Sequence, residues 1–509
     1  MADLSPQNAA AVEAEVTAPP AHGIVGRLAQ AFAIYGFASF GIRALNFLLL
    51  MVYAHYLHPF DYGIIYMADI IASFLIIFAG LSIDSALQRL YFQHNHDMEE
   101  LRSYLGTAIR FGLSWMIAFL ALVLIAGRSL QSYLAVHVAV PFYPYIAMAM
   151  GTATATQGMQ YRLAVYQAAR RPRSYAFLAL VMFVLTAAGC IYGVVIQRGG
   201  AIGMMRGKLV GAVLTFLVAL WSMRGLLTAR FQWRFVRDSL TFSLPLVPHL
   251  VMASGLVVAD RLILAHYRDL SEVGIYSLAY TLGMVMFLVT QSLSLAWLPM
   301  FFELADGREE NRQLLSRICS GLVIFLVAIA CLGILLSPPF IHVALDHRYH
   351  AAAQIVPLIV MGYLFHALFS LFTFSILQAK RTAFVFMISL TAFSVNVALN
   401  FALIPRWGMY GAAWATTMAY AVEALFAFLL AQRFFALSYR VTEIFSGFAV
   451  AGGALWLTQL PSMLRWQGLL LVFFAVVALG LLALIGRRDL LSAFTIIRTT
   501  RKREPQVAG

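Results

Sequence analysis

The chain has 509 residues, of which 62% are hydrophobic and 11% charged, with a formal net charge of +13. Soluble domains carry about 25% charged residues, so the composition indicates a membrane protein. The polar stretches between the apolar runs are too short to form a core of their own, which excludes a soluble catalytic domain.

Apolar runs of about 20 residues recur along the chain, and each is long enough to cross a hydrocarbon core. They predict fourteen membrane-spanning helices, preceded by a disordered tail over 1–28 and followed by a basic tail over 487–509. The predicted helices cover residues 30–57, 62–88, 105–127, 141–167, 174–197, 201–223, 239–265, 273–302, 315–337, 351–379, 383–404, 409–435, 441–460 and 467–486.

Arginine and lysine are distributed unevenly between the two sides of the predicted membrane. The two tails and the loops after even-numbered helices, together with Arg317 and Arg433 at the helix ends beside those loops, hold 23 of the 35 basic residues, and the loops after odd-numbered helices hold six. Loops rich in Arg and Lys stay in the cytoplasm, so both tails are expected there. These cytoplasmic Arg and Lys residues account for most of the net charge, and binding to nucleic acid is not needed to explain it.

Two segments of the first half recur in the second half, at offsets of 211 and 208 residues. The matches pair Ala54-His55-Tyr56 and Gly63 with Ala265-His266-Tyr267 and Gly274, and pair Arg173, Gly200 and Gly203 with Arg381, Gly408 and Gly411. Each repeat therefore holds six helices, and an even number gives both copies the same orientation in the membrane.

The predicted fold is an all-α polytopic membrane protein. Its two six-helix lobes, 29–238 and 239–438, are expected to be related by a pseudo-two-fold axis near the membrane normal. Two additional helices, over 439–486, follow the second lobe.

Three motifs lie in the same order as in a known family: Asp61-Tyr62-Gly63, Asp260-Arg261, and the segment from Asn396 and Asn400 through Pro405 to Gly408 and Gly411. From about residue 30 to 440 the chain resembles the bacterial polysaccharide (O-antigen and exopolysaccharide) flippases. Their superfamily also contains the multidrug and toxin extruders and the lipid II flippase. The resemblance implies export of undecaprenyl-pyrophosphate-linked oligosaccharide units from the cytoplasmic to the periplasmic leaflet of the bacterial inner membrane.

Several of the matching residues have a structural explanation. Glycines are expected where helices turn tightly or approach closely, namely at Gly63, Gly274, Gly408 and Gly411. Pro405 is expected to end the helix over 383–404. Asn396 and Asn400 are four residues apart, so both can hydrogen-bond to one neighbouring helix.

Charges placed inside a bilayer are costly and therefore face a cavity or a partner. Arg43 is the one basic residue predicted to lie mid-helix, and it meets either a substrate phosphate or a structural ion-pair partner. Arginine suits phosphate because its guanidinium stays charged and bonds bidentately. Arg261, Asp69 and Tyr66 are the other predicted residues of a cavity for the pyrophosphate or the sugars.

Carboxylates in helices can bind the coupling ion. Glu423, central in its helix, either couples transport to H+ or Na+ or pairs with a structural arginine. Asp260 is the second coupling candidate, although its side chain leaves the helix about 100° away from that of Arg261. His366 is expected to be a packing residue rather than a proton carrier.

Motifs for other chemistry are missing from the sequence. No G-x-x-x-x-G-K-[ST] loop occurs, so ATP is not expected to be the direct fuel. No cofactor, resident metal or enzymatic activity is predicted; the cluster of His342, Asp346, His347 and His350 forms either a solvated loop or a metal site.

The favoured function is a secondary transporter that flips lipid-linked oligosaccharide by alternating access. The alternatives are a lipid II flippase, a multidrug or cation antiporter of the same superfamily, and a membrane-embedded polymerase or glycosyltransferase. The expected partners are the lipid-linked oligosaccharide, membrane lipids, H+ or Na+, and the polymerase and other polysaccharide assembly proteins.

Overall fold

The computed structural model describes residues 41–94, 97–137, 140–227, 230–305, 308–437, 451–456 and 458. Within these ranges the regular structure is helical, which confirms the predicted all-α polytopic fold. Nine helices in the described ranges are long and apolar enough to cross a membrane. The predicted helix over 467–486 and most of that over 441–460 lie outside the described residues.

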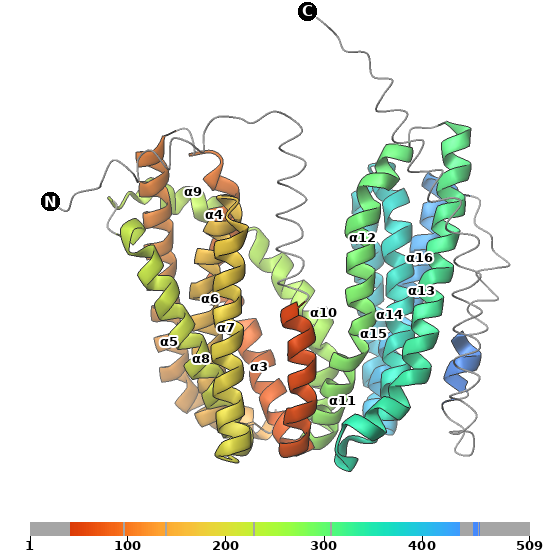
Figure 1. Ribbon diagram of the computed structural model, residues 1–509, viewed down its shortest axis with the longest axis horizontal. Coiled ribbons are helices and arrows are strands. Elements are labelled where there is room, and N and C mark those ends of the chain that lie inside the picture. The colour runs from red at the N-terminus through yellow and green to blue at the C-terminus, as the bar shows by residue number, and fades with distance from the viewer. Residues whose placement is uncertain are drawn as a thin grey trace, which may run out of the picture. The chain divides into compact units, whose positions relative to one another are not determined.

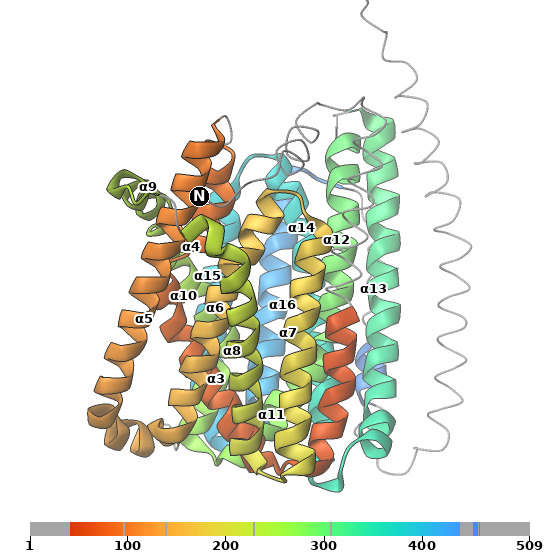
Figure 2. The same cartoon turned by 60° about the vertical axis from the view of Figure 1, so that its left-hand side comes forward.

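The chain divides into two compact units, and the first contains the described residues of Met1–Leu50, Ala72–Ala126 and Ala147–Val251. Its helices are α4 (Ile83–Tyr91), most of α5 (Met98–His137), α6 (Ala147–Ala168), α7 (Pro172–Ile191), α8 (Gly200–Leu227) and α9 (Trp233–Ser243). Helices α7 and α8 run side by side (Figures 1 and 2), and facing glycines such as Gly189 and Gly207 leave no space for a Cβ atom between them. Small residues of this kind let membrane helices approach closely.

The second unit contains Met51–Ile71, Gly127–Ile146 and the described residues of Met252–Gly509. Its helices are the start of α3 (Pro59–Gly80), most of α10 (Leu246–Tyr267), α11 (Leu270–Gly283), α12 (Val285–Leu304), α13 (Glu309–Ala344), α14 (Ala352–Gln378), α15 (Thr382–Trp407) and α16 (Met409–Phe434). Helix α14 is the most deeply buried span and packs against α11, α12, α13 and α16 (Figure 1).

The two repeated glycines meet in this second unit. A Cβ atom on Gly63 would overlap the carbonyl oxygen of Leu270, and a Cβ on Gly274 would overlap that of Pro59. Helices α3 and α11 therefore cross at a point where each contributes its glycine to the other's first turn. The expectation that these glycines allow close helix approach is confirmed.

The short helix η3 (His347–Tyr349) joins α13 to α14 and contacts the end of the helical segment 41–56. Tyr349 donates its hydroxyl proton to the carbonyl of Leu57 at 3.0 Å, and Arg348 Nη2 donates to the carbonyl of His55 at 3.1 Å. Asp346 accepts from the backbone and the guanidinium of Arg348. These hydrogen bonds hold the pKa of Asp346 well below its usual value.

Some helix boundaries differ from the prediction. The predicted helix 62–88 is divided into α3 and α4, because Leu81 and Ser82 adopt left-handed backbone angles (φ 47° and 52°). The run 239–265 is divided at Leu244–Pro245 into α9 and α10, and 273–302 is divided at Met284 into α11 and α12.

The expectation that Pro405 ends its helix is wrong. Helix α15 continues to Trp407 and ends at Gly408, whose φ of 55° favours glycine. A proline in the last turn gives up one backbone hydrogen bond, a loss that the helix end tolerates. The terminating residue is therefore the glycine that belongs to the repeat.

Candidate functional site

Polar side chains gather inside the second unit on five helices that are otherwise apolar. Within α11, α14, α15 and α16 they are three or four residues apart, so they share one face of each helix. We call them the polar cluster: Asp260 and Arg261 on α10, Tyr276 and Tyr280 on α11, Tyr363 and His366 on α14, Asn396 and Asn400 on α15, and Thr416, Tyr420 and Glu423 on α16.

Asp260 and Arg261 form a buried ion pair in this cluster. Their residues are 3% and 6% exposed, and Arg261 Nη1 lies 3.1 Å from Asp260 Oδ1. The same oxygen accepts the backbone N–H of Arg261 at 2.8 Å, and Tyr276 Oη donates to Asp260 Oδ2 at 2.6 Å. Neighbouring side chains leave a helix about 100° apart, yet the guanidinium of Arg261 reaches the carboxylate of Asp260.

Tyrosine rings enclose the guanidinium of Arg261. Its Cζ atom lies 4.1 Å from the ring centre of Tyr280 and 5.5 Å from that of Tyr276. A desolvated cation over an aromatic face gains about 2 kcal/mol. Together with the carboxylate, these rings compensate the cost of burying the charge.

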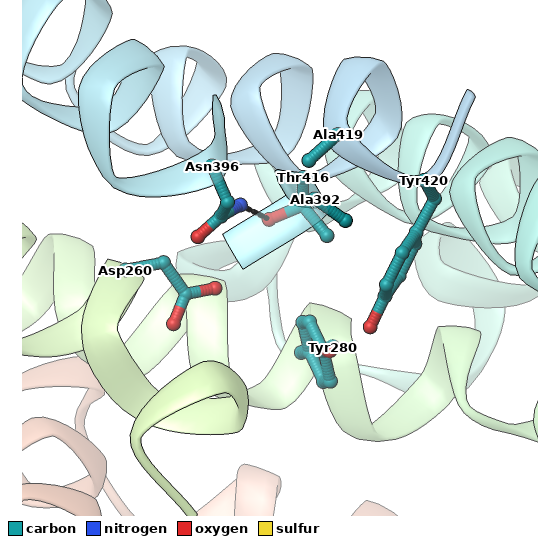
Figure 3. Close-up of a pocket in the computed structure, with 7 residues that line it drawn as sticks. All are labelled: Asp260, Tyr280, Ala392, Asn396, Thr416, Ala419 and Tyr420. Carbon is teal, nitrogen blue, oxygen red and sulfur yellow. Dashed lines mark hydrogen bonds between the residues drawn. The ribbon is translucent and has the colours of Figure 1, made fainter. Parts of the chain in front are cut away.

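A small recess opens beside Asp260, and Figure 3 shows the carboxylate of Asp260 and the hydroxyl of Tyr420 pointing toward the space between the labelled residues. It is lined by Asp260, Tyr280, Ala392, Asn396, Thr416, Ala419 and Tyr420. The centre of a water molecule can reach about 10 Å³ of it, which is room for about one water molecule. Oxygen donors around so small a space suit a water or a small cation, and exclude a sugar ring from this recess in the conformation described.

Both asparagines are predicted to hydrogen-bond to a neighbouring helix, and Asn396 does so, while Asn400 bonds to Asn396 in its own helix. Asn400 Nδ2 donates to Asn396 Oδ1 at 2.9 Å, and Asn396 Nδ2 donates to Thr416 Oγ1 on α16 at 3.4 Å. Both amides are buried. They link α15 to α16 at the edge of the recess (Figure 3).

Among the described residues, Glu423 pairs with a histidine. The structural arginine that the sequence offers as an alternative partner is not the residue it contacts there. His366 Nδ1 lies 3.0 Å from Glu423 Oε2, and Glu423 is 2% exposed. The imidazole ring centre is 5.0 Å from that of Tyr420, which is followed by Tyr363 at 6.0 Å. Tyr363 is in turn 5.6 Å from Tyr280. Adjacent polar rings therefore connect Glu423 with the Asp260–Arg261 pair.

The remaining predicted site residues are not among those that line the recess. Tyr66 on α3 is half-buried, and its hydroxyl is 3.0 Å from Thr281 Oγ1 on α11. Asp69 is half-buried on the same helix. Arg43 is exposed in the helical segment 41–56 and belongs to the first unit. The assignment of Arg43, Arg261, Asp69 and Tyr66 to a substrate cavity stays a prediction.

Sequence reasoning missed Tyr363 and Thr416. The signal was present, because Tyr363 lies three residues before His366, and Thr416 lies seven before Glu423, on strongly apolar helices. A polar stripe along such a helix marks the side that faces other helices rather than lipid.

The family model of the polysaccharide biosynthesis proteins matches residues 28–305. A comparison with curated proteins found no match.

Among solved structures, a lipid II flippase, MurJ, in an inward closed conformation superposes with a TM-score of 0.67. It is 17% identical and covers 90% of this chain and 99% of its own. An inward-facing multidrug resistance MATE family transporter of the MOP superfamily has a TM-score of 0.57 and 12% identity, with coverage of 83% and 99%. A MATE transporter of Vibrio cholerae has a TM-score of 0.53 and 14% identity, with coverage of 80% and 97%. At these identities the likeness establishes the fold.

Proposed function

The chain belongs to the polysaccharide biosynthesis protein family and has a transporter fold of the MOP type, and from this premise we propose that it flips lipid-linked oligosaccharide. The substrate is an undecaprenyl-pyrophosphate-linked repeat unit, which moves from the cytoplasmic to the periplasmic leaflet of the bacterial inner membrane. Both termini lie in the cytoplasm, and the product serves surface or exopolysaccharide assembly. Polymerase and other assembly proteins receive it there.

The observation that carries the proposal is the buried ion pair of Asp260 and Arg261. A charged pair inside a membrane protein is expensive to maintain and is a functional site by default. Its arginine matches the diphosphate of the substrate, and its carboxylate matches a cation. One pair thus holds the recognition groups for both a phosphate and a coupling ion.

Competition for Asp260 provides the coupling step. In the structure the carboxylate holds Arg261 at 3.1 Å. When H+ or Na+ occupies Asp260 from the adjoining recess, the attraction on the guanidinium is removed, and Arg261 becomes available to a phosphate oxygen. Arg43, in the helical segment 41–56, is proposed to bind a phosphate of the same substrate, and Tyr66 and Asp69 are proposed to contact the sugars.

Glu423 and His366 provide a second titratable pair in the same helix group. The rings of Tyr420 and Tyr363 lie between the two pairs. We propose that through these contacts a change of charge at Glu423 alters the interaction of Asp260 with Arg261. A cation that binds near Glu423 therefore changes how strongly Asp260 attracts Arg261. This supports coupling through the second lobe.

The reciprocal crossing at Gly63 and Gly274 supports alternating access. It joins the second helices of the two repeats, at the end that the Arg/Lys distribution predicts to be outside. We assign it to the state that is closed toward the periplasm. Opening that side requires the crossing and the contacts of Tyr349 and Arg348 to separate.

Complementation of a strain that lacks the gene tests the function. Arg43→Ala should reach the membrane at the normal level and abolish surface polysaccharide. Asp260→Asn leaves Arg261 buried without its partner and should lower stability, so it is compared at a matched amount of protein in the membrane, where it should also abolish surface polysaccharide. Lys380→Ala, which removes a charge outside the cluster, should support normal output. Normal polymer from both site variants would refute these assignments.

The same strain separates the alternative functions. Loss of viability on deletion would instead indicate a lipid II flippase. Loss of cationic dye efflux with intact polymer would indicate a drug antiporter.

A further inference from the structure

A second recess lies in the second unit, where the end of α12, the start of α13 and the end of α16 come together. It is lined by Leu304, Arg308, Arg312, Gln432, Arg433, Phe434, Phe435 and Ala436. The centre of a water molecule can reach about 330 Å³ of it. This space is far larger than that of the recess beside Asp260 and falls in the range of small-ligand sites.

Its charge has a single sign. Three of the lining residues are arginines, and none of these described lining residues is a carboxylate. Arg308, Arg312 and Arg433 are exposed at the rim. Guanidinium groups stay charged and bind phosphate oxygens bidentately, so the recess suits an anionic phosphate group.

The orientation of one arginine is fixed by backbone. Arg312 donates from Nε and Nη2 to the carbonyl of Ala436, at 2.8 and 2.6 Å, and its Nη1 makes no contact with that carbonyl. Gln432 Nε2 donates to the carbonyl of Leu437 at 2.9 Å. The chain after α16 is thereby held against α13, which keeps the shape of the recess.

Two of the lining residues, Phe434 and Phe435, are aromatic. The Cζ atom of Arg312 lies 5.9 Å from the ring centre of Phe435, and that ring is 6.2 Å from the fully buried Phe301. The ring of Phe434 is 5.0 Å from Phe384. Arginines and phenylalanines that line one recess match a molecule with a phosphate head and an apolar body, which is a lipid.

We propose that this recess is a binding site for the phosphate headgroup of an anionic lipid. Basic pockets between membrane helices bind such headgroups. The shared chemistry, a lipid phosphate with net negative charge, belongs both to phospholipids such as phosphatidylglycerol and to polyprenyl diphosphate carriers. The site is separate from the polar cluster, and binding there does not require the flipping reaction.

Binding to the purified full chain in detergent tests the proposal. The probes are short-chain phosphatidylglycerol, farnesyl diphosphate and, as a zwitterionic control, short-chain phosphatidylcholine, measured by native mass spectrometry. Each arginine near a lipid phosphate contributes about 1 kcal/mol, or about fivefold in affinity. Arg308→Gln with Arg433→Gln should therefore weaken binding of the anionic probes about 30-fold. Arg317→Gln, an exposed arginine of α13 outside the recess, should change it by less than twofold.

The outcomes separate the sources of the headgroup. Tighter binding of farnesyl diphosphate supports a site that receives the substrate's carrier, and equal or tighter binding of phosphatidylglycerol supports a bulk phospholipid site. An affinity of the double variant within twofold of the native chain, or equal binding of phosphatidylcholine, overturns the proposal. If the double variant does not fold, Arg433→Gln alone, at the exposed end of α16, gives the same test with an expected fivefold loss.

Discussion

Replacing Asp260 by asparagine should destabilise the protein strongly, because it leaves the charge of Arg261 buried without its partner. Asp260 is 3% exposed, and its two oxygens accept three hydrogen bonds, two from Arg261 and one from Tyr276. Removing one member of a buried pair costs about 3–5 kcal/mol. Tyr276→Phe removes one hydrogen bond to a charged acceptor and should cost less, about 1.5–3 kcal/mol.

A double-mutant cycle separates pairing from general damage. Arg261→Gln should be as costly as Asp260→Asn, because it leaves the carboxylate without its cation. Asp260→Asn with Arg261→Gln should cost less than the sum, because two amides leave no buried charge. The measurement is the equilibrium unfolding free energy of the purified chain in SDS–detergent mixtures. Single-variant losses that add within about 0.5 kcal/mol would show that the two residues do not interact and would refute the reasoning.

Three further predictions follow from other parts of the structure. Gly274→Ala should lower the free energy of unfolding by about 1–3 kcal/mol or more, because the added Cβ meets helix backbone that cannot move aside. Gly321 has open space around it, so Gly321→Ala should be neutral or slightly stabilising in the same unfolding assay. Glu423→Gln, which removes the charge beside His366, should make the rate of substrate transfer less dependent on pH or Na+, measured in proteoliposomes. Because the pKa of Asp346 is lowered in the folded chain, its ionised carboxylate should stabilise the fold above about pH 4, the usual carboxyl range, and this stabilisation should be lost as the pH falls further. The unfolding midpoints of Asp346→Asn and the native chain should therefore differ at pH 7 and converge in strong acid.

Each of these predictions has a contrary outcome. Equal stability of Gly274→Ala and Gly321→Ala would show that α3 and α11 do not cross closely at Gly274. An unchanged ion dependence in Glu423→Gln would make that residue structural. A constant difference between native chain and Asp346→Asn at every pH would show that the Asp346 charge does not contribute.

The scaffold was readable from the sequence because membrane spans and repeats leave periodic signals. Apolar runs predicted most of the described helices to within a few residues, and the offset of 211 residues marked Gly63 and Gly274, which meet at one crossing. The breaks at Leu81–Ser82 and at Met284 were not predicted. Each follows a glycine, Gly80 and Gly283, that is the last residue of its helix. A glycine inside an apolar run can end a helix or be tolerated within it, so the sequence alone did not mark these two as helix ends.

The site was only partly readable. Asp260, Arg261 and Glu423 stand out as charges in apolar surroundings, so each was identified alone. Asp260 and Arg261 are adjacent in the sequence, but their pairing was not predicted, because neighbouring side chains leave a helix about 100° apart. The partner of Glu423 could not be identified, because sequence spacing reports neighbours within one helix and not between helices. The contact of Glu423 with His366 joins two helices across 57 residues of chain. Such pairing appears only once the helices have packed.

Transfer of a fluorescent diphosphate-linked oligosaccharide between leaflets of proteoliposomes, under an imposed H+ or Na+ gradient, tests the central claim that Asp260 couples a cation to movement of the lipid-linked sugar. The native chain should transfer the substrate faster when the gradient is present. Asp260→Asn should transfer it slowly and at the same rate with or without the gradient. Gradient-stimulated transfer by Asp260→Asn at the native rate would contradict the account.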